Sequence, residues 1–142
     1  MSAIPVMLHI RGCQNYQDQE PDVIELTTEG TLEKDKEVWA IAYEESDLTG
    51  LAGVTTTFRV GKRGVALKRT GRLQSQMIFR EGYRHESLYQ MDFGALMIAV
   101  KATKIRHSLS EQGGSVDITY QIEIEESTAG TVDYHLDIQP VN

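Results

Sequence analysis

Apolar and polar residues alternate with a period of two along almost the whole chain. Between residues 115 and 125 every second residue is apolar, and the same rhythm returns in residues 131–138 and 4–10. Successive side chains of a β-strand point to opposite faces, so this alternation predicts strands with one face on a core and one face in water. Apolar residues at helical spacing are hard to find. The chain is therefore predicted to be all-β.

Glycine-containing turn signals interrupt the alternation at short intervals, for example at residues 61–64, 81–82 and 112–114. They divide the chain into ten predicted strands, over residues 3–11, 22–34, 37–44, 53–61, 64–70, 73–80, 84–92, 94–107, 114–126 and 130–140. Residues 12–21 are predicted to be a polar loop, and residues 45–52 a short helical turn. No linker, repeat or low-complexity tract divides residues 1–142, which predicts a single domain.

A sheet of ten antiparallel strands joined by short turns has to protect its two edges, and closing the sheet removes them. We therefore predict a single antiparallel up-and-down β-barrel of about eight to ten strands. A two-sheet sandwich is the alternative. Side chains or a ligand cavity would fill the barrel interior.

Composition narrows the cellular location that we expect for this barrel. Hydrophobic residues make up 40% and charged residues 25% of the chain, and the apolar stretch at residues 93–100 is too short to cross a bilayer. Residues 1–10 lack the basic and apolar regions of a signal peptide. Cys13 is the single cysteine, so an internal disulfide and a cysteine-based zinc site are both excluded. We expect a cytoplasmic protein without a membrane partner.

The net charge of −7 is unevenly distributed. Residues 59–106 hold eleven of the basic residues and three acidic ones, whereas residues 107–142 hold no lysine or arginine. In a meander of strands, these blocks predict a basic wall and an acidic wall. A basic wall favours an anionic partner: a phosphorylated metabolite, nucleic acid, or the acidic wall of a second copy in a homodimer. The pI near 5.0 argues against nucleic acid. Ordinary cross-strand pairing is the simpler interpretation.

Three segments carry a resemblance to a known family: "LTGLAGVTTTFRV" (48–60), "YRHESLYQMDFGALMIAVKATKI" (83–105) and "GGSVDITYQIEIEESTAG" (113–130). They resemble the small bacterial YwiB-like family, a domain of unknown function, over nearly the whole chain. The resemblance implies a calycin-type, lipocalin-like β-barrel. It brings no established activity and no functional residues.

Arg69 is the first candidate site residue, because it follows Val65 and Leu67 on the face predicted to point inward. An inward charge needs a carboxylate or an anionic ligand, since burying it unpaired is costly. Glu44, at the end of its strand, could pair with it. Alternatively, Arg69 grips a ligand carboxylate or phosphate with two hydrogen bonds, or lies past the buried segment. Thr56 is also predicted to point inward.

His85, Ser87 and Tyr89 lie on the more apolar face of the strand predicted at residues 84–92. His85 could contact a ligand, act as a general base, or ligate haem, which is the least favoured of these roles. The simpler interpretation is a hydrogen-bonded histidine near the barrel rim. The four histidines lie far apart in sequence, and no metal-binding motif is present, so no metal site is predicted.

Together these features predict a binding protein without catalytic activity and without a cofactor, which takes a small anionic or amphipathic molecule inside the barrel. Arg69 would neutralise the anion, His85 and Ser87 would donate or accept hydrogen bonds, and Tyr89, Tyr43 and Glu44 would support the site. One alternative is a protein or nucleic-acid interaction module that uses the basic wall of residues 59–106. Another is a hydrolase or isomerase with His85 as its base.

Overall fold

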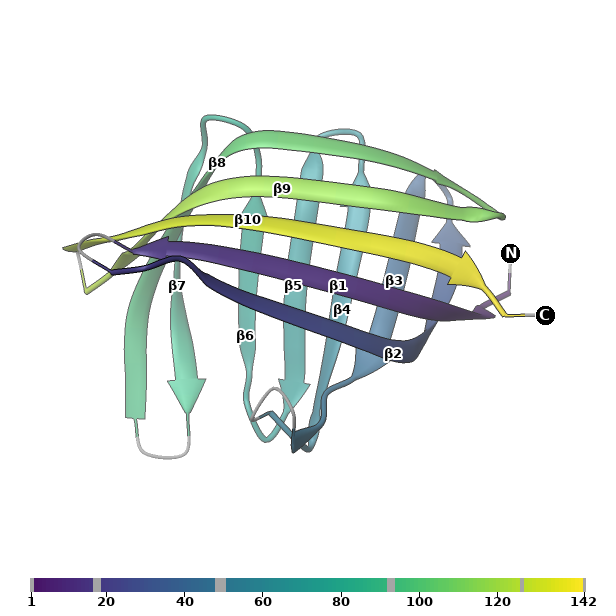
Figure 1. Ribbon diagram of the computed structural model, residues 1–142, viewed down its shortest axis with the longest axis horizontal. Coiled ribbons are helices and arrows are strands. Elements are labelled where there is room, and N and C mark those ends of the chain that lie inside the picture. Colours follow the sequence, from purple (N-terminus) through teal and green to yellow (C-terminus); the bar gives the residue numbers. More distant parts are fainter. Residues whose placement is uncertain (1, 17–18, 48–50, 92–93, 126, 142) are drawn as a thin grey trace.

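The computed structural model describes residues 2–16, 19–47, 51–91, 94–125 and 127–141. These residues form ten antiparallel strands joined in chain order (Figure 1). The strands are β1 (Ile4–Tyr16), β2 (Asp22–Asp35), β3 (Val38–Glu44), β4 (Val54–Gly61), β5 (Gly64–Gly71), β6 (Ser75–Phe79), β7 (Arg84–Met91), β8 (Gly94–Ser110), β9 (Gly113–Ile124) and β10 (Ser127–Pro140). No helix in the described ranges is long and apolar enough to span a membrane.

The strands form one sheet in the order β6-β5-β4-β3-β2-β1-β10-β9-β8-β7. Every strand pairs with its neighbours in sequence except at the join of β6 and β7, and β1 pairs with β10. An isolated bridge between Arg80 and Tyr83 links the two edges, and the backbone N–H of Ile78 donates to His85 Nδ1 at 3.3 Å. The predicted up-and-down barrel is therefore confirmed as a nearly closed one. We call the join of β6 and β7 the seam.

Two groups of strands cross each other steeply in Figure 1, with β1, β2, β8, β9 and β10 in front and β3 to β7 behind. Strands β2 and β8 each belong to both groups. The first part of β2 pairs with β1 and its last part with β3, while the first part of β8 pairs with β7 and its last part with β9. Gly30 lies at the corner in β2, where an added Cβ would come within 2.5 Å of the Ala42 carbonyl oxygen. Glycine is required there because the backbones approach so closely.

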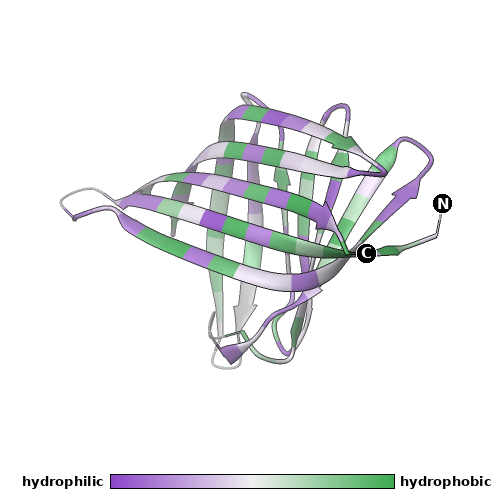
Figure 2. Ribbon diagram, turned by 45° about the vertical axis from the view of Figure 1, so that its right-hand side comes forward, coloured by the Kyte–Doolittle hydropathy of each residue, from purple (hydrophilic) through white to green (hydrophobic). Residues whose placement is uncertain are grey.

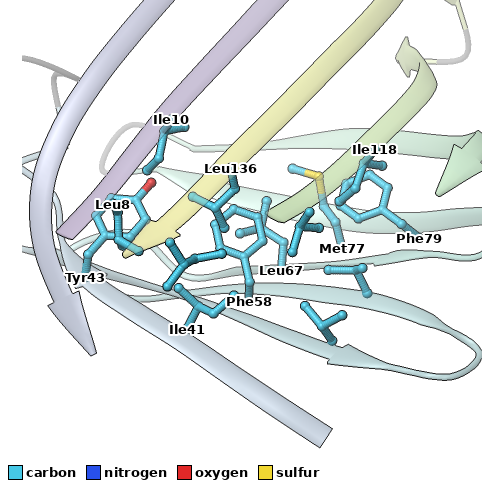
Figure 3. Packing of buried hydrophobic residues seen from close by; sticks show 14 of the residues in the cluster. Leu8, Ile10, Ile41, Tyr43, Phe58, Leu67, Met77, Phe79, Ile118 and Leu136 are labelled. Carbon is cyan, nitrogen blue, oxygen red and sulfur yellow. The ribbon is translucent and has the colours of Figure 1, made fainter. Parts of the chain in front are cut away.

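The alternating pattern of the sequence becomes the inside and the outside of the barrel, as the bands of hydropathy along the strands show (Figure 2). The half of the barrel nearer the chain termini is packed with side chains such as Leu8, Ile41, Phe58 and Leu136 (Figure 3). These four are 1% exposed or less. Burial of this apolar surface stabilises the fold.

Two local predictions were wrong or incomplete. Residues 12–16, predicted as loop, continue β1, because Cys13 pairs with Val23 on one side and with Asp133 on the other. Two backbone ladders thus outweigh the polar side chains of this segment. In the segment 45–52, predicted to carry a short helical turn, Asp47 has a 3₁₀-helical conformation, which agrees with the prediction, while residues 48–50 lie outside the described residues.

Candidate functional site

The other half of the barrel contains a cavity of about 350 Å³ that is partly open to solvent. It lies at the end where β1, β3, β5 and β9 finish, and Arg69, Glu45, Gln14 and Tyr43 contribute polar groups to its wall. The apolar lining consists of Ile10, Ile24, Leu26, Leu51, Leu67, Met77, Ile98, Ile122 and Val132. The barrel is thus packed at one end and hollow at the other, which is an arrangement that small barrels use to hold one ligand.

A buried ion pair lies in the wall of this cavity. Arg69 Nε lies 3.9 Å from Glu45 Oε2, and the two side chains are 15% and 1% exposed. The Thr56 hydroxyl, which is fully buried as predicted from the alternation, donates to the same Glu45 oxygen at 2.5 Å. Each charge of the pair compensates the other, and either one would be costly to bury alone.

The partner of Arg69 is Glu45 and not Glu44, so the pairing predicted from the sequence was wrong. Alternation continues one step past the end of β3: Tyr43 is buried, Glu44 is exposed, and Glu45 is buried. The Glu45 backbone N–H donates to the Val54 carbonyl at 2.8 Å, which prolongs the ladder with β4. Glu44 points outward and accepts a hydrogen bond from Thr55 at 2.9 Å.

Arg69 Nε is buried, and it has no hydrogen-bond partner among the residues that the structure describes. Its distance from Glu45 is too long for a hydrogen bond. A guanidinium carries five N–H donors, and buried polar groups in proteins are nearly always hydrogen-bonded. The cavity wall therefore presents a cation with one buried N–H donor, at Nε, that the described protein groups leave unsatisfied.

Three tyrosines surround the ion pair. Tyr43, Tyr120 and Tyr134 line the cavity, and burial raises the pKa of each phenol above its ordinary value of 10.0. The Tyr43 and Tyr134 phenols lie close enough to affect each other's pKa: Tyr134 raises the pKa of Tyr43, and Tyr43 opposes the rise in the pKa of Tyr134. All three phenols are consequently neutral near pH 7, and they can serve as polar but uncharged groups toward a ligand.

The other predicted site residues lie on β7, away from this cavity. His85 and Ser87 are half-buried, and neither is among the residues that line the cavity. His85 accepts the hydrogen bond from Ile78 across the seam. If His85 served as a base or as a haem ligand, the reactant or the haem would therefore have to bind at the seam and not in the cavity. The Tyr89 backbone pairs with Leu96, and its side chain lies outside the described part of the structure.

The structure adds Glu45, Tyr120 and Tyr134 to the candidates. All three lie on the inward face of an alternating pattern, which is the signal that could have identified them. That signal alone does not distinguish a residue of the packed half from a residue of the cavity, because both halves show the same alternation.

The outer surface does not form one uninterrupted basic wall. Arg69 points inward, Arg84 is paired with Glu86 and Glu123, and Lys62 lies 3.5 Å from Glu37. An outer groove of about 410 Å³ does collect Lys62, Arg63, Arg80 and His107, together with Glu81. In the described part of the chain, no group of three or more His, Cys, Asp or Glu residues is arranged to hold a metal ion.

His135 lies outside the barrel between two carboxylates. Its Nδ1 lies 2.5 Å from Asp117 Oδ1, and its Nε2 lies 2.9 Å from Asp137 Oδ2. The hydrogen bond to Asp117, followed by the one to Asp137, raises the His135 pKa above 6.5, although partial burial opposes the change. Both ring nitrogens face acceptors, which favours the doubly protonated imidazolium.

We therefore expect an NMR titration to place the His135 pKa above 6.5. The Asp117→Asn variant should lower this pKa, whereas Asp133→Asn should change it little, because Asp133 accepts its hydrogen bond from Thr119. A raised pKa in the folded state stabilises the protein below the unfolded pKa, and this contribution is lost as the pH rises through the folded value. A His135 pKa at or below 6.5 would contradict this assignment.

Comparison with known proteins places the chain in a family. The family model described as "Domain of unknown function (DUF1934)" matches residues 8–138. The uncharacterized beta-barrel protein YwiB of Bacillus subtilis (strain 168) is 29% identical over 121 residues, which cover 84% of this chain and 82% of that protein. The crystal structure of the Bacillus subtilis ywiB protein matches with a TM-score of 0.87 and 22% identity, covering 99% of this chain and 94% of that one. The resemblance noted in the sequence is thus confirmed, and the chain belongs to the DUF1934 family.

Proposed function

We propose that this protein binds a small anionic or amphipathic molecule in the cavity at the hollow end of its barrel, without catalysing a reaction. One observation carries the proposal: the buried Arg69 Nε has no hydrogen-bond partner in the described part of the structure, and Arg69 lines an otherwise largely apolar cavity. A ligand oxygen would provide the acceptor that this donor needs. The family resemblance implies a lipocalin-like barrel, and lipocalins hold one small ligand inside in this way.

The chemistry of the wall defines what such a ligand looks like. Arg69 and the tyrosine hydroxyls would take a polar head group, while residues such as Leu67, Met77 and Ile98 would contact an apolar body. A volume of about 350 Å³ is at the low end of the range for ligand pockets, roughly 300–1,000 Å³, so the ligand is small. We place this binding function in the cytoplasm.

Titration calorimetry with decanoate tests the proposal. Decanoate combines a carboxylate with an apolar chain, and we expect it to bind the wild-type protein. Arg69→Gln should weaken binding by about 30-fold or more, since removing one partner of a buried charged hydrogen bond costs at least about 2 kcal/mol. Lys68→Gln is the matched control, because Lys68 precedes Arg69 on β5 and points outward into solvent.

The control should bind decanoate as the wild type does. Circular dichroism and thermal unfolding of each variant would show that the protein is folded under the conditions of the titration. Equal affinities of the wild type and Arg69→Gln, or no binding by the wild type, would overturn the proposal. Native mass spectrometry of the purified wild type would show independently whether a small molecule is retained.

A further inference from the structure

We infer that the cavity is built for a zwitterionic head group, and specifically for an α-amino acid with an apolar side chain. The inference rests on the proposed function and narrows it. Its basis is that the cavity wall presents both signs of charge side by side, Arg69 and Glu45, while the other described residues of the lining are uncharged (Figure 3 shows the neighbouring Tyr43).

Charge balance distinguishes the classes of ligand. Arg69 and Glu45 together carry no net charge, and the three tyrosines of the lining are neutral. A monoanion bound beside them would leave a net negative charge in a poorly solvated space, and a phosphate dianion would leave a larger one. A zwitterion adds no net charge, so the occupied cavity stays neutral.

The geometry of the pair also suits a zwitterion. The α-ammonium and α-carboxylate groups of an amino acid are attached to the same carbon, so they can reach only two protein groups that are close neighbours. Arg69 Nε and Glu45 Oε2 are 3.9 Å apart, which is close but longer than a hydrogen bond. The ligand carboxylate would accept hydrogen bonds from the guanidinium, and its ammonium group would donate to the Glu45 carboxylate.

Thr56 contributes by positioning Glu45. Its buried hydroxyl donates to Oε2, which orients the carboxylate in the wall. A carboxylate has about four acceptor positions, and Thr56 provides one of the hydrogen bonds that it can accept. Beyond the pair, the aliphatic lining and the small volume select an apolar side chain rather than a polar or long one.

Three probes with one apolar body separate the two charges of the head group. L-phenylalanine carries both charges, 3-phenylpropionate lacks the ammonium group, and 2-phenylethylamine lacks the carboxylate. Titration calorimetry on the wild type should show that L-phenylalanine binds most tightly, by about tenfold or more over each of the other two. This ranking requires no variant, so it does not depend on how a substitution affects folding.

Glu45→Gln then gives effects of opposite sign. The affinity for L-phenylalanine should fall by about tenfold or more, because the partner of the ammonium group is lost. The affinity for 3-phenylpropionate should rise, because a repelling charge is removed. The matched control is Glu44→Gln, one residue earlier, whose side chain points outward to Thr55. Neither affinity should change in this control.

Failure of the inference and failure of the proposed function have different signatures. If L-phenylalanine binds no more tightly than 3-phenylpropionate, or if Glu45→Gln leaves its affinity unchanged, the inference is wrong. The proposed function would still stand if decanoate bound in an Arg69-dependent way. If decanoate did not bind the wild type, or bound Arg69→Gln equally well, the proposed function would be overturned and the inference, which rests on it, would fall too.

Discussion

Replacing Phe58 with alanine should lower the free energy of unfolding by about 3–5 kcal/mol, because it removes a large side chain from the packed half of the barrel. Phe58 is 1% exposed, and its ring lies 5.6 Å from the ring of Tyr134. Figure 3 shows it among Leu8, Leu67 and Leu136, side chains contributed by three other strands. Because these neighbours are held on different strands of a nearly closed barrel, they cannot easily collapse onto the vacated space.

Urea unfolding monitored by circular dichroism measures this effect. Arg59→Gln is the control, since Arg59 follows Phe58 on β4 and is exposed on the outer face. We expect its free energy of unfolding to stay within about 0.5 kcal/mol of the wild type. A loss below about 1 kcal/mol in Phe58→Ala would mean that this half of the barrel is not tightly packed.

Removing the positive charge of the buried pair should also destabilise the protein. In Arg69→Met, Glu45 keeps a buried carboxylate without its cationic partner, and breaking a fully buried pair costs about 3–5 kcal/mol. Because 15% of the Arg69 side chain is exposed, we expect a smaller loss of about 2–4 kcal/mol. The measurement is the urea midpoint together with the slope of the transition.

The double variant Arg69→Met/Glu45→Gln shows whether the loss of stability in Arg69→Met comes from the unpaired charge of Glu45 or from lost packing. It removes both charges and leaves an amide oxygen that can still accept the hydrogen bond from Thr56. We expect it to be more stable than Arg69→Met alone, although it carries one more substitution. Strictly additive losses would show that the stability effect of Arg69 arises from its packing and not from its charge.

Much of the fold could be predicted because the period of two is so regular. The strand predicted at residues 114–126 is observed as β9 (Gly113–Ile124), and that predicted at 84–92 as β7 (Arg84–Met91). The extension of β1 through Tyr16 could not be predicted, because residues 12–16 lack the regular alternation of apolar and polar side chains. They are held as a strand by pairing with β2 and β10, which come from distant parts of the sequence.

The candidate site was predicted only in part, for a related reason. Alternation correctly predicted that Arg69 points inward, and Tyr43, which was predicted to support the site, also lines the cavity. It says nothing about where a strand stops contributing to the interior, so the ion-pair partner was placed at Glu44 instead of Glu45. Nor does alternation say which strands meet. The face of His85 was predicted as the more apolar face of its strand, but the position of His85 at the seam with β6, where it is half-buried, could not be predicted.

The central claim is that a ligand binds inside the hollow half of the barrel at Arg69. Following the arginine Nε–H resonances by ¹⁵N NMR while decanoate is added tests this claim most directly. We expect the Arg69 resonance to shift as decanoate saturates the protein, while that of the outward-facing Arg59 stays in place. An Arg69 resonance that does not move, whether decanoate binds elsewhere or does not bind, would contradict the account.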